Sequence, residues 1–122
     1  MHSARLLDHF QNPRNVGELG PPAVTVAVEN PACGDLMRLS IRIEAGRVSE
    51  VRYQTRGCTA SVAAGSALTE LVQGRNAAEL DAIDSASVIN ALGGLIPESR
   101  HAAALCVDAL REAIRKSRDV AP

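Results

Sequence analysis

Three consecutive runs of alternating apolar and polar residues dominate the first half of this chain. They cover residues 24–28, 37–43 and 48–55, and most of their larger apolar side chains stand at alternate positions. A period of two predicts strands with one buried and one solvent-facing side. Because the connections are short, and the second is the tight Ala45-Gly46 turn, we predict an antiparallel meander.

The rest of the chain has helical periodicity. The residue before a proline disfavours the helical conformation, which ends the first helix at Asn12. Gly74 suits the left-handed conformation that ends many helices. The predicted helices cover residues 2–11, 60–73, 77–83, 85–92 and 97–117. Strands followed by helices predict an α+β fold, namely a three-stranded antiparallel β-meander with helices packed on one face and a long C-terminal helix.

Length and composition narrow the class of protein. The 122 residues are expected to form a single domain over residues 1–122, with a frayed tail after about residue 117. Since only one tyrosine and one phenylalanine are present, the core is expected to be aliphatic and rich in alanine. The net charge of −1, from scattered charges, argues against nucleic acid or a membrane surface as a partner.

The sequence also bears on the cellular location of the protein. The chain shows neither a signal-peptide pattern at its start nor an apolar run of membrane-spanning length, so a cytoplasmic protein is expected. In that reducing compartment, three cysteines, an odd number, argue against a disulfide framework. The thiols are then available for a metal, for persulfide chemistry or for burial.

The first candidate site segment is residues 31–35, between the first two predicted strands. Gly34 allows a tight turn between Cys33 and Asp35, so that thiol and carboxylate can point at one centre. A carboxylate exchanges more readily than a thiolate, which suits a site that loads and releases a metal. The alternative is a surface turn with a half-buried cysteine.

Two further candidates stand at predicted helix starts. Cys58 follows Gly57 where a strand gives way to a helix, and a helix N-terminus favours the thiolate form that binds metals or attacks sulfur. The alternative is a small buried residue that closes this corner. His101 lies in the first turn of the last helix, where the imidazole is kept neutral and able to bind a metal. Alone, it would be taken for an ordinary surface residue.

Together these segments resemble the IscU/NifU family of iron–sulfur cluster assembly scaffolds. The likeness covers residues 2–116 and rests on four segments, residues 8–17, 31–35, 57–74 and 93–101. By this resemblance four residues are ligands of a cluster or metal: Cys33, Asp35, Cys58 and His101. The family likeness also implies a pyridoxal-phosphate cysteine desulfurase that delivers sulfur as persulfide, iron entering the same site, and acceptor apo-proteins that receive the [2Fe–2S] cluster.

The chain departs from the family at two places. Ala102 replaces the third family cysteine, directly after His101, and alanine neither binds a metal nor accepts sulfur. Cys106 is one helical turn further on, on the apolar stripe of the helix, so we interpret it as a core residue rather than an extra ligand. Residues 95–99 lack the second proline and the lysine by which IscU-type members bind a dedicated Hsp70 chaperone, so that partner is not expected.

The sequence thus predicts a scaffold or carrier rather than an enzyme. Two thiolates, a carboxylate and an imidazole can hold a transient [2Fe–2S] cluster, iron or Zn²⁺. One alternative is a sulfur relay in which Cys58 or Cys33 receives persulfide and passes it on without building a cluster. Another is a zinc-stabilised adaptor or regulator of a desulfurase.

Overall fold

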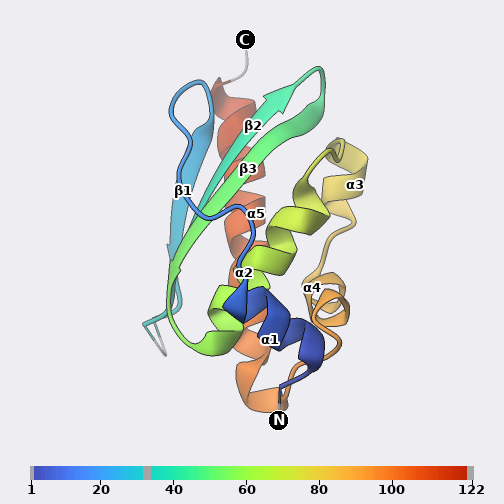
Figure 1. Ribbon diagram of the computed structural model, residues 1–122. Coiled ribbons are helices and arrows are strands. Elements are labelled where there is room, and N and C mark those ends of the chain that lie inside the picture. Colours follow the sequence, from blue (N-terminus) through green and yellow to red (C-terminus); the bar gives the residue numbers. More distant parts are fainter. Residues whose placement is uncertain (1, 32–33, 121–122) are drawn as a thin grey trace.

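A three-stranded antiparallel sheet forms the centre of the fold (Figure 1). The protein is seen in a computed structural model that describes residues 2–31 and 34–120, without the side chain of Val120. The strands, in the order in which they pair, are β1 (Val24–Glu29), β2 (Leu36–Glu44) and β3 (Arg47–Arg56). Both pairs of neighbouring strands are antiparallel, so the predicted meander is confirmed.

Helices make up most of the remaining chain. In the described residues they are α1 (Ala4–Gln11), α2 (Thr59–Val72), α3 (Ala77–Asp81), α4 (Ser85–Ala91), the 3-10 turn η1 (Pro97–Ser99) and α5 (Arg100–Val120). No described helix is both long enough and apolar enough to cross a membrane.

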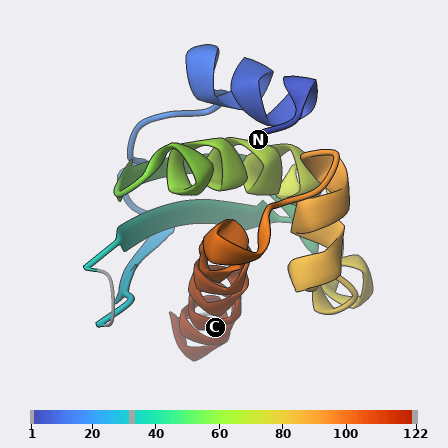
Figure 2. The same cartoon turned by 90° about the horizontal axis from the view of Figure 1, so that it is seen from below.

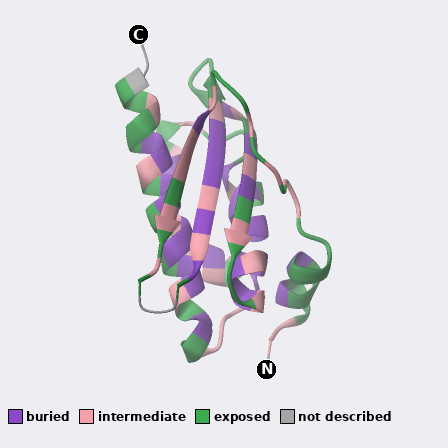
Figure 3. Cartoon of the chain, turned by 90° about the vertical axis from the view of Figure 1, so that its left-hand side faces the viewer, coloured by how far each residue is buried: buried purple, intermediate pink, exposed green. Residues whose placement is uncertain are grey.

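The helices cover the apolar face of the sheet and leave the other face open to solvent; Figure 3 views the sheet with the helices behind it. Along β2, Met37, Leu39 and Ile41 are buried, whereas Arg38, after Met37, and Arg42, after Ile41, are partly exposed. α5 packs across β1 and β2, and α2 packs against β3. The α+β arrangement therefore agrees with the strand periodicity.

The C-terminal helix differs from its prediction at both ends. Its first three predicted residues, Pro97–Ser99, form the 3-10 turn, and α5 continues to Val120 instead of ending near residue 117. Arg115 supports the last turn, because its guanidinium lies 3.2 Å from the carboxylate of Asp119 one turn later. The tail predicted to fray is thus helical as far as it is described.

The core is aliphatic and rich in alanine, as predicted. Tyr53 is buried, whereas Phe10, the other aromatic residue of the chain, is 40% exposed. α2 approaches β3 closely at Gly65, where a Cβ atom would lie 2.3 Å from the Tyr53 ring. The Tyr53 hydroxyl donates a hydrogen bond to the Val62 carbonyl of α2 (2.7 Å). β3 and α2 are therefore in direct contact at Gly65, which has no side chain.

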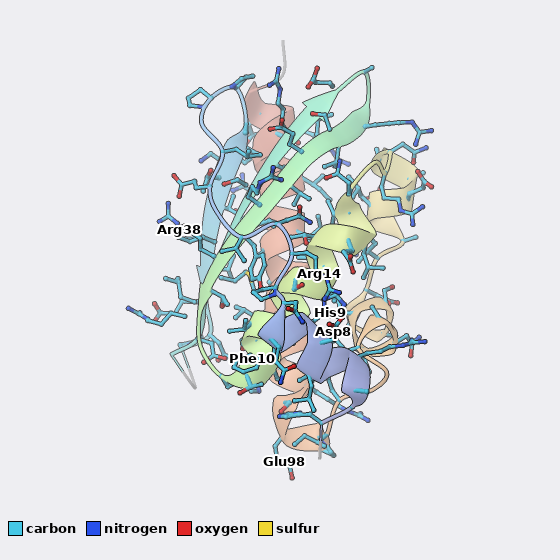
Figure 4. The ribbon with its side chains drawn as sticks, in the orientation of Figure 1. Asp8, His9, Phe10, Arg14, Arg38 and Glu98 are labelled. Atoms are coloured by element: carbon cyan, nitrogen blue, oxygen red, sulfur yellow. The ribbon has the colours of Figure 1, made fainter. Side chains whose placement is uncertain are left out.

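The N-terminal segment is tied to the middle of α2. α1 lies over α2 (Figure 2), and the ring of His9 lies with its Nδ1 2.7 Å from the Ser66 hydroxyl. That hydroxyl also accepts the backbone N–H of Arg14 (2.9 Å), and the Asn15 amide donates to Thr69 (3.0 Å). Figure 4 shows His9 and Arg14 where the two elements meet. Part of the family-like segment 8–17 thus fastens α1 to α2.

Candidate metal centre

Three of the predicted site residues converge at one end of the sheet. The Cys58 Sγ atom lies 3.8 Å from Asp35 Oδ2 and 3.9 Å from His101 Nε2, and that Nε2 lies 3.3 Å from the same carboxylate oxygen. They are the one group among the described residues whose thiol, carboxylate and imidazole atoms are spaced for a common ion. The fourth candidate, Cys33, lies outside the described residues.

The turn between β1 and β2 presents Asp35. Gly34 adopts a left-handed φ of +75° there, and its N–H donates to the Asn30 carbonyl (2.7 Å), while the Asn30 N–H donates to the Asp35 carbonyl (2.8 Å). These hydrogen bonds close the tight turn that was expected from the glycine at position 34. Asp35 is 7% exposed, so its carboxylate faces inward, toward the start of α2.

Cys58 is the residue that caps the N-terminus of α2. Its carbonyl accepts the backbone N–H groups of Ser61 (3.0 Å) and Val62 (3.2 Å), but its side chain makes no capping bond. The thiol is exposed, so the alternative of a small buried residue at this corner is wrong. An exposed sulfur at a helix N-terminus has the setting of a reactive or ligating thiol.

His101 presents a defined nitrogen to the group. Its Nδ1 atom lies 3.0 Å from the Glu98 carbonyl, and because a carbonyl can only accept, Nδ1 carries the proton. In the neutral ring Nε2 is then an electron-pair donor that faces Asp35 Oδ2 and Cys58 Sγ. The imidazole nitrogen and the carboxylate oxygen can therefore share a proton or bind a common metal ion.

The separations suit a metal ion. Ligand atoms bound at ~2.0–2.3 Å to a tetrahedral zinc ion lie about 3.3–3.8 Å from one another. The three separations here, 3.3, 3.8 and 3.9 Å, span this range and slightly exceed it. Oxygen, sulfur and nitrogen donors of this kind fit zinc or iron and could hold either.

Sequence reasoning did not identify the residues that surround the Asp35 carboxylate. Ser61 donates a hydrogen bond to Asp35 Oδ2 at 2.5 Å. Gly57 is also close, since a Cβ atom there would be 2.7 Å from the carboxylate carbon. The available signal is spacing along α2, which places the hydroxyl of Ser61 one helical turn after Cys58.

The two other notable positions of α5 are both buried. Ala102, at the place of the third family cysteine, is inaccessible to solvent, and Cys106 is fully buried in the core. Burial raises the pKa of the Cys106 thiol to about 12, so this sulfur stays protonated at neutral pH. Cys106 therefore packs as a small apolar residue, as the helical stripe predicted.

Known proteins are similar to this chain in sequence and in fold. Residues 1–120 match the family model described as NifU-like N terminal domain. Iron-sulfur cluster assembly scaffold protein IscU 1 of Archaeoglobus fulgidus is 42% identical over 114 residues, which span 93% of this chain and 74% of that protein. The scaffold protein IscU of Azotobacter vinelandii is 37% identical over 118 residues, spanning 93% and 91%.

The architecture also has a solved counterpart. The crystal structure of a nitrogen-fixing NifU-like protein (N-terminal) from Brucella abortus superposes with a TM-score of 0.78 over 98% of this chain and 95% of that chain, at 22% identity. At this identity the likeness concerns the fold, whereas the family-model match covers nearly the whole sequence. The chain therefore belongs to the NifU-like N-terminal domain family.

Proposed function

We propose that this protein is a scaffold or carrier for iron–sulfur clusters, with Cys33, Asp35, Cys58 and His101 as ligands of the bound iron. The observation that supports it best is the meeting of carboxylate, thiol and imidazole donor atoms within 3.9 Å of one another. The IscU proteins to which the chain is similar are named iron-sulfur cluster assembly scaffold proteins. A transient [2Fe–2S] cluster is then the cargo, and zinc occupies the site when iron and sulfide are absent.

The donor set suits binding followed by release. Sulfur and nitrogen donors hold iron or zinc firmly, whereas the carboxylate of Asp35 is a harder donor that such metals exchange more readily. The Cys58 side is exposed, so a bound metal or cluster would face a docked acceptor protein. Apo-proteins that take up the cluster are therefore proposed partners.

We further propose that sulfur arrives as persulfide from a cysteine desulfurase. The Cys58 thiolate attacks the outer sulfur of the desulfurase persulfide, so that a new S–S bond forms on Cys58, the old one breaks, and the desulfurase cysteine leaves as thiolate. The exposed sulfur of Cys58 permits this approach. Cys33 is the other candidate acceptor. A cytoplasmic location and independence from a dedicated Hsp70 chaperone belong to the same proposal.

A sulfur relay without cluster assembly is the second candidate function. This function is favoured because alanine replaces the third family cysteine at position 102, whereas Cys58 is present and exposed. A relay needs one reactive thiol, not a complete set of ligands.

Anaerobic reconstitution separates the two functions. The purified protein is incubated with ferrous iron, cysteine, a cysteine desulfurase and dithiothreitol, which reduces persulfide sulfur to sulfide, then desalted and analysed by ultraviolet–visible absorption and by iron and sulfide content. A parallel incubation without dithiothreitol is analysed for persulfide on Cys58. Iron and sulfide bound in equal amounts, and lost in the Cys58→Ala variant, support the scaffold. Persulfide on Cys58 without bound iron would leave only the relay. A protein that takes up neither iron nor sulfur contradicts both proposals.

A further inference from the structure

The carboxylate of Asp35 is held by the protein before any metal arrives. Asp35 is 7% exposed, and a buried carboxylate is stable only when other groups donate to it. Ser61, which is fully buried in the first turns of α2, donates its hydroxyl to Oδ2 at 2.5 Å. A hydrogen bond to a charged oxygen is the strong kind, and this one is as short as such bonds become.

The same oxygen atom faces the other two donors. Asp35 Oδ2 lies 3.3 Å from His101 Nε2 and 3.8 Å from Cys58 Sγ, and the Ser61 hydroxyl lies 3.5 Å from that sulfur. Ser61 therefore contacts two of the candidate ligands from a buried position behind them. Its single hydroxyl proton is committed to the carboxylate, which is its nearest acceptor.

The Asp35 carboxylate also lies close to the backbone of Gly57. A Cβ atom at Gly57 would lie 2.7 Å from the Asp35 carboxylate carbon and 2.9 Å from Oδ2. The carboxylate is thus close to both a hydroxyl donor and a residue without a side chain. With both contacts in place it has little freedom to rotate away from Cys58 and His101.

We infer that Ser61 is a positioning residue for the metal centre, which holds the Asp35 carboxylate in the orientation in which it binds a metal together with Cys58 and His101. This inference rests on the proposed function, since it names what sets the affinity of that same site. Ser61 acts through Asp35 and is not itself a ligand. Partners of this kind typically contribute 10-fold to 100-fold to metal affinity.

Zinc affinity and cobalt spectra test this role. Zinc affinity of the metal-free protein is measured by competition with a chromophoric chelator, and the Co²⁺ complex is examined by its d–d absorption. Ser61→Ala is expected to weaken zinc binding by roughly 10-fold to 100-fold and to change the cobalt bands. Ser61→Thr keeps a hydroxyl and is expected to restore most of the affinity.

Ser66→Ala is the matched control. Ser66 lies on the same helix and is equally buried, but its hydroxyl serves the N-terminal segment. We expect this variant to lose folding stability while the folded fraction keeps the wild-type affinity and spectrum. Ser61→Ala is also combined with Asp35→Ala, where it should have no further effect on zinc affinity, because the group through which it acts is gone.

Each outcome decides one of two questions. If the wild type binds neither zinc nor cobalt, the proposed metal site fails, whatever Ser61 does. If the wild type binds and Ser61→Ala binds equally well, the inference about Ser61 is wrong and the site remains. A loss that persists in the Asp35→Ala background shows that Ser61 acts through the helix, which also contradicts the inference. This double-variant comparison holds even where the threonine variant does not fold.

Discussion

The two described cysteines have opposite surroundings, and their roles should separate accordingly. Cys58 is exposed beside Asp35 and His101, whereas Cys106 is fully buried in the core. We predict that Cys58→Ala abolishes zinc binding, because it removes a thiolate ligand. Cys106→Ala should leave zinc binding intact and cost about 1 kcal/mol of stability through a small void. Metal analysis and urea denaturation check both; loss of zinc in Cys106→Ala would contradict this assignment.

The pH dependence of stability should report on His9. Burial and the charge of Arg14 lower the pKa of His9, although Glu70 and Asp8 act in the other direction. Between that lowered pKa and the ordinary value of about 6.5, the unfolded chain binds more protons here than the folded protein. The free energy of unfolding of the metal-free protein should therefore fall as the pH decreases through this range.

His9→Asn is the variant that tests this origin. Asparagine keeps a polar group near Ser66 but has no proton to gain, so the slope of stability against pH should flatten. Urea denaturation at pH 7.5, 6.5 and 5.5 measures the slope. An unchanged slope in His9→Asn would place the pH dependence elsewhere in the molecule.

At the residue scale, the sequence indicated which side chains would lie together better than it indicated the residues around them. That Asp35, Cys58 and His101 converge was expected from a family resemblance, because separations of 23 and 43 residues form no local motif. Ser61 and Gly57 were missed as contacts of Asp35. Spacing along α2 places Ser61 near Cys58 but does not indicate that a turn 26 residues away directs the Asp35 carboxylate toward Ser61. Burial of Cys106 was predictable from the helical stripe alone.

Among the elements, the contact of α2 with β3 is the most sensitive to added volume. A Cβ atom at Gly65 would lie 2.3 Å from the Tyr53 ring and 3.1 Å from the Met37 methyl group, and the bond from Tyr53 to Val62 restrains the ring. We predict that Gly65→Ala lowers the free energy of unfolding by about 1–3 kcal/mol. Gly20→Ala, where no atom lies within 4 Å of the added Cβ, is the control. Equal stability of the two variants would contradict the close contact.

The elements themselves were largely predictable. Alternation and helical periodicity located the three strands and the helices, since both reflect which side chains face the core. The register shift between Arg42 and Ile43 was not predicted, nor was the 41% exposure of Ile43. Alternation continues through residue 43 in sequence, so only the pairing with β3 reveals the irregularity. The 3-10 start of the last helix was missed for a similar reason, because proline suits the first turn of either helix type.

At the scale of the whole molecule, a bound metal would join three distant parts of the chain. Asp35 precedes β2, Cys58 begins α2 and His101 begins α5. We predict that zinc at 100 times its dissociation constant raises the free energy of unfolding by about 2.7 kcal/mol, and that Cys58→Ala removes this gain. Thermal denaturation with and without zinc is the measurement. A melting temperature that does not respond to zinc would contradict the cross-link.

The replaced family cysteine gives a further prediction. Ala102→Cys should raise the yield or lifetime of the reconstituted cluster, because it returns a thiol beside His101 at the family position. Ala103→Cys is the control, since Ala103 is equally buried on the same helix but does not occupy that position. Absorbance of the reconstituted proteins over time gives the comparison. Equal behaviour of the two variants would show that a thiol at residue 102 does not complete the site.

The candidate ligands are far apart in the sequence, so the ribosome synthesises them at different times. Cys58 and His101 are 43 residues apart, so at 5–20 residues per second the ribosome needs roughly 2–9 s to deliver the imidazole after the thiol. Throughout that interval the nascent chain holds a cysteine at the start of α2 and an aspartate before β2, but not the nitrogen that completes the group. If the proposed site binds a metal, the newborn chain therefore presents an incomplete set of ligands until α5 leaves the ribosome and folds across the sheet.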